Sequence, residues 1–171
     1  MDLTVFAGMA AADLRQYIRF LLHHYRTMDS FWYIYLTEIC GEATADRVNE
    51  KVWGRVAALA ARDLAQRFGI KEGGLKGFVQ ALRYWPWHIL VGYRIEERAG
   101  EVIITVPSCP TQEARRQRGL PEYQCKEMHR LEFESFAQEI DVRIRTECAF
   151  APPDPHPPEI MCRWRFYLAG D

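Results

Sequence analysis

The sequence has little net charge, no long apolar run and no signal-peptide pattern in its first residues, and each of these features argues against a class of protein. Its 171 residues carry a formal net charge of −1, so no overall positive field draws the chain to nucleic acid or to an anionic membrane. No apolar run reaches the roughly 18 residues of a transmembrane helix. The first residues lack the basic-then-apolar layout of a signal peptide, because Asp2 and Asp13 bracket a short mixed stretch. We therefore expect a cytoplasmic protein with no nucleic-acid partner and no membrane partner.

The chain also lacks internal repeats and closely spaced cysteines. None of its five cysteines belongs to a Cys-x-x-Cys pair, which is the spacing typical of a zinc ribbon. In a reducing compartment, five cysteines favour free thiols or metal ligands over structural disulfides. The one biased segment is a proline-rich loop over residues 151–159.

The composition is that of a folded domain. The chain is 49% hydrophobic and 13% aromatic, which is ample for a core at this length. We expect a single domain over residues 1–171, with a helical part (10–84) followed by a part made of hairpins and helices (88–168).

The helical part shows apolar residues at helical spacing, and glycines at 41 and 69 mark helix ends. Ser30 separates the first two predicted helices. The predicted helices cover residues 11–28, 31–39, 43–68 and 75–82. The longest of them carries an apolar stripe that we expect to face the core: Val48, Val52, Val56, Leu59, Leu64 and Phe68.

The second part begins where the apolar period changes to two. The predicted elements are strands 88–97 and 101–107, helices 110–117 and 123–140, and strands 142–150 and 160–168. This order predicts an α+β fold in which an N-terminal helical layer packs on a four-stranded antiparallel sheet. The sheet consists of two hairpins, with two helices between them.

The segment from Phe31 to Leu36 is apolar nearly all round. Such a helix is buried on two sides or lies in a subunit interface. We expect a homodimer with Trp32 or Tyr35 in the interface.

Two cysteines fall near predicted helix starts. Proline suits the first helical position, so Pro110 places Cys109 at the N-cap of its helix. Free backbone amides and the helix dipole lower the pKa of a thiol there, so we expect a reactive Cys109. Cys125 falls in the first turn of the next helix, where the same argument applies more weakly.

The other two C-terminal cysteines lie on the last predicted hairpin. A hairpin centred on its proline-rich loop sets Cys148 directly opposite Cys162, with Cα atoms roughly 4.5–5.5 Å apart. Both point toward the core side, and this arrangement suits a disulfide or a shared metal ion. The alternative is that each cysteine only fills space in the core.

Two histidines are candidates for the same site. His156 stands between prolines and is a candidate nitrogen ligand or proton-transfer group, with an exposed loop histidine as the alternative. His129 follows Cys125 by one helical turn and shares its face, so it can join a Cys/His site or be a buried, hydrogen-bonded histidine.

Arginines follow Cys109 in the same helix. Arg115 and Arg116 are candidates to bind a substrate carboxylate, with a solvated basic face as the alternative. We expect Arg116, His129 and Trp164 to contact a small-molecule ligand.

These residues resemble the C-terminal half of the L-2-amino-thiazoline-4-carboxylate hydrolase-like proteins and a related uncharacterised cytosolic family of prokaryotes. With Phe31-Trp32 and Trp53, the resemblance covers residues 30 to 168. The hydrolase-like proteins carry an acidic residue soon after the second cysteine, for which Glu127 or Glu132 stands here. The segments that carry the resemblance are Cys109-Pro110, Gly119-Leu120-Pro121-Glu122, Cys125, Cys148 and Cys162-Arg163-Trp164-Arg165-Phe166.

The last eighty residues are also similar to the 4-vinyl reductase domain. That resemblance implies an α+β fold that binds a small ligand, and zinc bound by cysteines in some members. The glycine of that domain's last hairpin loop is replaced here by prolines.

Three functions follow as expectations. The first is a cytosolic small-molecule-binding or sensory domain with a cysteine-rich site, in which Cys109, Cys125, Cys148 and Cys162 are the expected zinc ligands. The second is a hydrolase that opens a small heterocycle or amide, with Cys109 as nucleophile or ligand, His156 or His129 as base and Arg115 or Arg116 as carboxylate clamp. The third is a protein–protein module that dimerises through its apolar helix.

Overall fold

The computed structural model describes residues 1–170 and contains six α-helices and four strands in that range. After a short turn of 3-10 helix (Thr4–Phe6), the elements in chain order are α1 (Ala11–Cys40), α2 (Glu42–Arg67), α3 (Gly74–Leu82), α4 (Pro86–Val91), β1 (Arg94–Arg98), β2 (Glu101–Val106), α5 (Pro110–Gln117), α6 (Lys126–Ile140), β3 (Ile144–Phe150) and β4 (Cys162–Leu168). The predicted α+β class is confirmed, including the two helices between the two hairpins.

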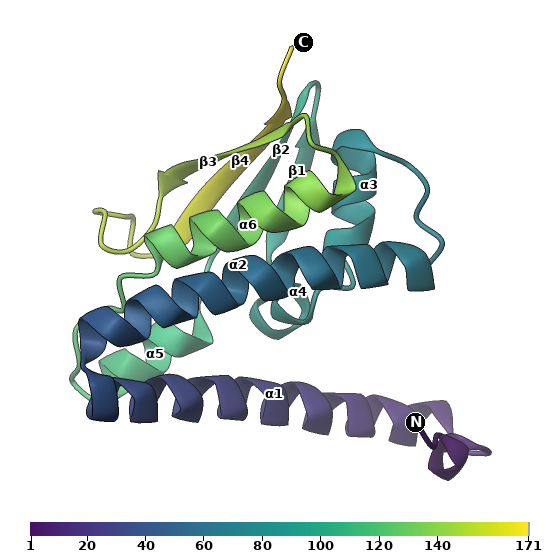
Figure 1. Cartoon of the computed structure of the whole chain (residues 1–171), viewed down its shortest axis with the longest axis horizontal. Helices are drawn as coiled ribbons and strands as arrows, with labels where there is room; N and C mark the ends of the chain where they lie inside the picture. The colour runs from purple at the N-terminus through teal and green to yellow at the C-terminus, as the bar shows by residue number, and fades with distance from the viewer. Residues whose placement is uncertain (171) are drawn as a thin grey trace.

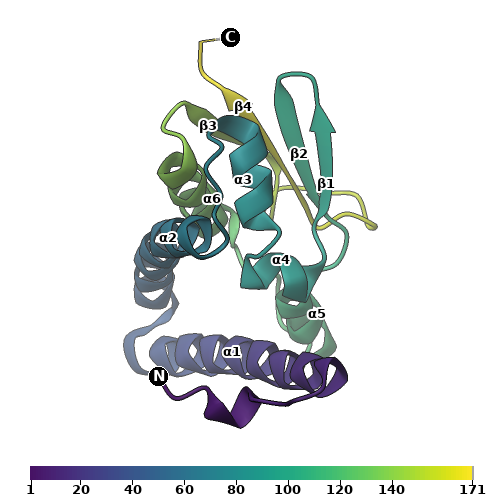
Figure 2. The same cartoon turned by 90° about the vertical axis from the view of Figure 1, so that its right-hand side faces the viewer.

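The four strands form one antiparallel sheet in the order β1-β2-β4-β3. Helices α3 and α6 lie against this sheet, α2 packs along α6, and α1 is the outermost helix (Figures 1 and 2). The core between the sheet and the helices is strongly aromatic, and its largest fully buried side chains include Phe78, Trp85, Phe133, Phe136, Trp164 and Phe166. None of the helices within residues 1–170 combines the length and apolar character that crossing a membrane requires.

The first two predicted helices are a single helix, so their separation at Ser30 was wrong. Serine can cap a new helix, but it can also bond back to its own helix one turn earlier. Ser30 Oγ donates to the Arg26 carbonyl at 2.9 Å, and Thr27 Oγ1 donates likewise to the His23 carbonyl. Their hydroxyls therefore leave the helix unbroken, and α1 runs on to Gly41.

The predicted core stripe of α2 is confirmed at Val56 and Leu64, which pack against the core, but it was wrong at three other positions, although the bounds of the helix are close to those predicted. Val52, Leu59 and Phe68 are 36%, 46% and 50% exposed. The face that α2 turns toward α6 consists largely of small residues, which allow two helix backbones to approach closely. The buried residues of α2 are Ala45, Asn49, Trp53, Ala57 and Ala61.

The first predicted strand begins too early. Residues 86–91 form helix α4 because Pro86 suits its first turn and Gly92, with φ of 73°, ends it in the left-handed region. The alternation over these residues is not a strand pattern, since Ile89 is 53% exposed. Similarly, α6 begins at Lys126 rather than 123, so Cys125 is its N-cap residue.

Candidate functional site

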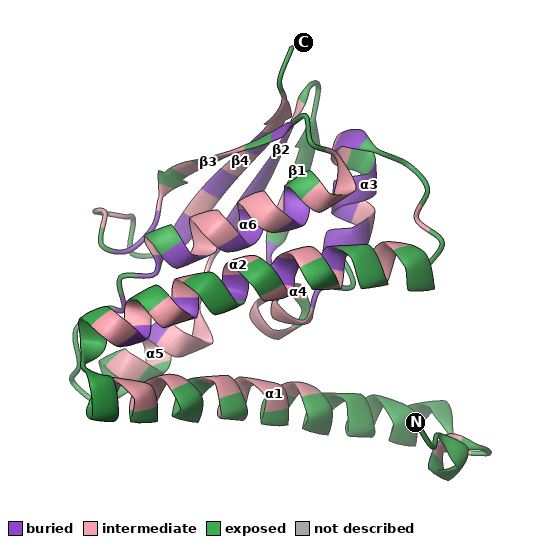
Figure 3. Cartoon of the chain, viewed as in Figure 1, coloured by how far each residue is buried: buried purple, intermediate pink, exposed green. Residues whose placement is uncertain are grey.

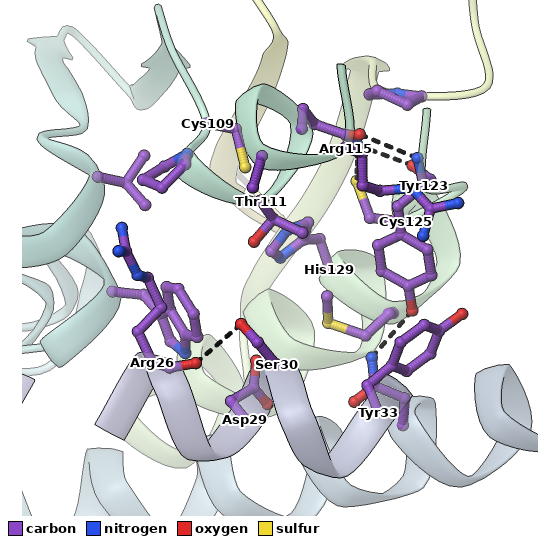
Figure 4. A pocket seen from close by; sticks show the side chains of 18 of the residues that line it. Arg26, Asp29, Ser30, Tyr33, Cys109, Thr111, Arg115, Tyr123, Cys125 and His129 are labelled. Carbon is purple, nitrogen blue, oxygen red and sulfur yellow. Dashed lines mark hydrogen bonds between the residues drawn. The ribbon is translucent and has the colours of Figure 1, made fainter. Parts of the chain in front are cut away.

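A cavity of about 320 Å³ lies where α1, α4, α5 and α6 meet near one end of the sheet. Figure 4 shows side chains from α1 pointing across this space toward the start of α5, with His129 of α6 between them. Apolar and aromatic side chains make up much of the wall, among them Trp53, Trp87, Tyr93, Met128 and Phe133.

The position of the aromatic wall is set by packing behind it. Tyr25 of α1 contacts both Trp53 and Trp87, with ring centroids 6.2 and 5.9 Å away. Trp53 and Trp87 meet edge to face at 5.6 Å. Such contacts between rings contribute beyond the area they bury. They hold α1, α2 and α4 together around the cavity.

A buried polar chain crosses the cavity wall on α6. His129 Nδ1 lies 2.6 Å from Glu132 Oε2, and Trp85 Nε1 donates to Glu132 Oε1 at 3.0 Å. The His129 ring also hydrogen-bonds the Cys125 sulfur. Residues four and three apart share a helix face, which explains why this set comes from one short stretch. Along α6 the three groups follow one another in the order Cys125 sulfur, His129 imidazole and Glu132 carboxylate.

Charge stabilises the protonated form of His129. Burial lowers the pKa of His129, but its hydrogen bonds to the Cys125 sulfur and the Glu132 carboxylate outweigh burial. The pKa therefore lies well above the ordinary value of 6.5. The contact between His129 Nδ1 and Glu132 Oε2 therefore favours the protonated imidazole.

A second carboxyl group enters the cavity from α1. Burial, and then the nearby Glu132 carboxylate, raise the pKa of Asp29 to about 6. The Trp53 indole, which donates a hydrogen bond to Asp29, and the charge of His129 act in the opposite direction. Asp29 therefore changes charge close to neutral pH, which is common for groups in functional sites.

The loop before α6 is fixed by an amide side chain of α5. Gln112 is 3% exposed, and its Nε2 donates to the Tyr123 carbonyl at 2.8 Å and to Cys125 Sγ at 3.6 Å. Its Oε1 accepts from the Tyr123 amide at 2.9 Å. The paired bonds position both Cys125 and the Tyr123 ring at the cavity.

Cys109 occupies the predicted N-cap of α5 and lines the cavity. The expected fall in the pKa of its thiol was wrong. Burial raises the pKa of Cys109, and the backbone amides of Gln112 and Thr111 only partly oppose this. An apolar cavity wall disfavours the thiolate more than the helix start favours it.

The predicted pairing of Cys148 with Cys162 was wrong. Cys148 faces Trp164, and Cys162 faces Val106 of β2, because the loop is asymmetric and the register shifts between Cys148 and Phe150. Burial raises the pKa of the Cys148 thiol to about 11 and that of Cys162 to about 12.

Three of the four expected zinc ligands, Cys109, Cys125 and Cys162, line the cavity, while Cys148 does not. Within residues 1–170, no group of three or more His, Cys, Asp or Glu side chains is arranged to hold a metal ion. Zinc binding stays a prediction, and the donors would have to move to form a tetrahedral site.

Three other predicted site residues lie away from the cavity lining. His156 contacts Glu122, with Nε2 3.2 Å from its Oε1, in the proline-rich loop. Arg116 is exposed and pairs with Glu113 at 2.8 Å. Trp164 is fully buried in the core.

Arginines surround part of the cavity. Arg115 lines it, while its Nε donates to the Pro121 carbonyl at 2.7 Å. Arg26 of α1 and Arg118 after α5 also line it, and neither has a side-chain partner among residues 1–170. These cations make the surroundings of the cavity suited to an anionic group.

Asn49 adds an unused acceptor. It is 4% exposed, and its Nδ2 donates to the Tyr123 hydroxyl at 2.9 Å, but its Oδ1 has no hydrogen-bond partner in the described chain. A buried acceptor without a partner is costly unless a ligand or water satisfies it.

Sequence reasoning missed Asp29, Asn49 and Arg26, which approach the site from α1 and α2, far from α6 in the sequence. Glu132 was considered only as a candidate for the acidic residue that the hydrolase-like proteins carry soon after their second cysteine. The spacing of Cys125, His129 and Glu132 along one helix face was a signal that could have identified all three together.

The fold and site define an α+β domain with an internal cavity lined by thiols, a buried histidine–carboxylate pair and arginines. Residues 10–168 match the model of a family described as "Family of unknown function (DUF6125)", and the chain belongs to this family. No curated protein and no solved structure matches the chain.

Proposed function

We propose that the protein binds a small organic molecule in the cavity between α1, α5 and α6. The observation that carries this proposal is a cavity of about 320 Å³ in which aromatic walls converge with a few positioned polar groups. Small-molecule sites have this composition and begin at roughly 300 Å³.

The lining defines the chemistry of the ligand. Trp53 and Trp87 suit a flat or apolar body, and the guanidinium groups of Arg26 and Arg118 suit a carboxylate or another anion. Asp29 and the free acceptor of Asn49 suit an N–H group on the same molecule. The proposed ligand is a compact anion that also carries a nitrogen donor.

We place this function in the cytoplasm, because all five cysteines are free thiols in the structure and free thiols persist in reducing compartments.

A fluorescence titration tests the proposal. Anilinonaphthalene sulfonate, an aromatic anion, should bind with a saturable fluorescence increase at one site per chain. Arg26→Glu should weaken its binding roughly tenfold, which corresponds to about 1.4 kcal/mol. Arg19→Glu makes the same charge change on an exposed residue of α1 outside the cavity lining and should bind like the wild type. Equal affinity for both variants contradicts the proposed orientation of the ligand.

A second candidate, hydrolysis of a C–N bond, is favoured by the order Cys125, His129, Glu132. A thiol beside an imidazole that is oriented by a carboxylate is the arrangement of thiol hydrolases. Cys125 replaces Cys109 as the proposed nucleophile because His129 contacts the Cys125 sulfur, whereas burial raises the pKa of Cys109.

The proposed reaction has two steps. The Cys125 thiolate adds to the carbon of a small cyclic amide or amidine, the C–N bond breaks, and the nitrogen leaves with a proton from His129. Water then attacks the carbon–sulfur intermediate, His129 takes a proton from that water, and the C–S bond breaks to regenerate the thiolate. Glu132 keeps the imidazole oriented in both steps.

The resemblance to thiazoline-carboxylate hydrolase-like proteins supplies a first substrate. Loss of L-2-amino-thiazoline-4-carboxylate should be measured with the wild type, with Cys125→Ser and with Cys109→Ser as the matched cavity thiol. The hydrolase proposal expects Cys125→Ser to lose at least about a hundredfold in rate while Cys109→Ser retains most activity. An active wild type that is equally affected by both changes contradicts the assigned nucleophile. A wild type that binds the compound without consuming it leaves only the binding function.

A further inference from the structure

Helix α1 carries an unbroken series of apolar residues at alternating spacings of four and three. This spacing gives an average period of 3.5 residues, which is the heptad period of helices that pack along one another. The series extends over almost the whole helix, and its members, here named the α1 seam, are Leu14, Ile18, Leu21, Tyr25, Met28, Trp32, Tyr35 and Ile39.

Most of the α1 seam has no partner in the core formed by residues 1–170. Helix α1 contains no buried residue, as its green and pink ribbon in Figure 3 shows. Among its members only Tyr25 packs on the core, where its ring contacts Trp53 and Trp87. The rest is exposed, from 39% at Leu14 to 80% at Ile39.

The face of α1 next to the seam is already in use. Arg26, Asp29 and Tyr33 point from it into the cavity, and Tyr33 donates from its hydroxyl to Asp46 of α2 at 2.6 Å. Most of the α1 seam is therefore left without cover beside the cavity face, and Figures 1 and 2 show α1 as the outermost helix.

The area of this surface matches that of a stable interface. Tyr17 and Phe20 widen the seam along one side and are 38% and 55% exposed, and the Tyr17 ring contacts Phe6 with centroids 5.0 Å apart. With about half of each large side chain exposed, and roughly 150–250 Å² in an aromatic side chain, the surface amounts to on the order of 800 Å². A specific interface buries about 800 Å² on each partner, and the largest apolar patch of a typical monomer is about 300–600 Å².

We infer that the α1 seam is the interface with a second copy of this chain, so that two α1 helices pack lengthwise about a twofold axis. A heptad seam fits a helix with the same period, and a twofold axis brings identical surfaces together. A membrane surface fits less well, since helices that lie on membranes carry an excess of Lys and Arg. Helix α1 has three arginines balanced by Asp13, Asp29 and Glu38.

Light scattering of the full chain tests the inference. The wild type should have twice the chain mass of 20.0 kDa at micromolar concentration. Leu21→Glu should shift the mass to that of the monomer, because it places two carboxylates in the interface. Gln16→Glu adds the same charge to an exposed position of α1 outside the seam and should remain a dimer.

Leu21 packs on no part of the core, so its substitution should leave the helical circular dichroism of the monomer unchanged. Ile18→Glu serves as a second variant of the same kind, and the wild-type mass decides the matter on its own if both variants misfold. A monomeric wild type, or a Leu21→Glu variant that stays dimeric, overturns the inference. A monomeric wild type that sediments with phosphatidylglycerol vesicles overturns it in favour of a membrane surface.

Discussion

Replacing Asp29 by Asn should stabilise the protein near neutral pH and have little effect in acid. The pKa of Asp29 rises from 3.8 to about 6 on folding, chiefly because the carboxyl is buried and secondly because Glu132 is near. A raised carboxyl pKa means that the folded state resists ionisation of this group. Its cost to stability is absent below about pH 4, grows as the pH rises toward 6, and is complete above about pH 6.

The structure sets the size of this effect. A rise of about two in pKa corresponds to about 3 kcal/mol, at roughly 1.4 kcal/mol for each factor of ten. Asp29 is only partly buried at the cavity, so solvent screening reduces this to about 1–2 kcal/mol. Asparagine keeps an oxygen that can accept the hydrogen bond from Trp53 while removing the charge.

Urea unfolding at about pH 4 and about pH 8 measures the difference directly. Asp29→Asn should raise the free energy of unfolding at the higher pH by about 1–2 kcal/mol and by much less at the lower pH. Asp13→Asn removes an exposed carboxylate from the same helix outside the cavity lining, and it should not raise the free energy of unfolding at the higher pH. The reasoning is refuted if Asp29→Asn changes stability equally at both pH values or destabilises the protein at the higher one.

Three further outcomes are expected. Gly77→Ala should destabilise the fold by more than about 4 kcal/mol in urea unfolding, because its added Cβ would lie 1.8 Å from the backbone oxygen of Glu72; a loss under about 1 kcal/mol would contradict this packing. Cys109 should react with iodoacetamide more slowly than the exposed Cys40, as followed by mass spectrometry, and faster reaction would mean that the thiol is not held in its buried position. Trp85→Phe should lower the free energy of unfolding by about 1–3 kcal/mol, because it removes the indole N–H that donates to the buried Glu132 carboxylate. An unchanged melting temperature would count against that hydrogen bond.

Local signals predicted much of the fold. Pro110 placed the start of α5 and Cys109 at its N-cap, and the alternation of 101–107 placed β2. These features depend on neighbouring residues, so the sequence displays them directly. Ser30 shows the limit, because its hydroxyl can cap one helix or bond back to another, and only the whole of α1 decides between them.

The site depended on contacts between distant segments. Asp29 and Glu132 are more than a hundred residues apart, and no local pattern indicates that α1 lies across the N-terminal end of α6. The cysteine pairing failed for a related reason, since a two-residue difference in hairpin register is decided by packing on β2 and by the irregularity after Cys148. Cys109 was placed correctly, but its pKa depends on burial that a sequence does not display.

Filling the cavity tests the central claim most directly. Thr111 lines the cavity from the first turn of α5, and Thr44 stands in the first turn of α2, outside the lining. In titrations with anilinonaphthalene sulfonate, we expect saturable binding to the wild type and to Thr44→Trp, and none to Thr111→Trp. Binding to Thr111→Trp with unchanged affinity, or no binding to the wild type, would contradict the account of the cavity as a small-molecule site.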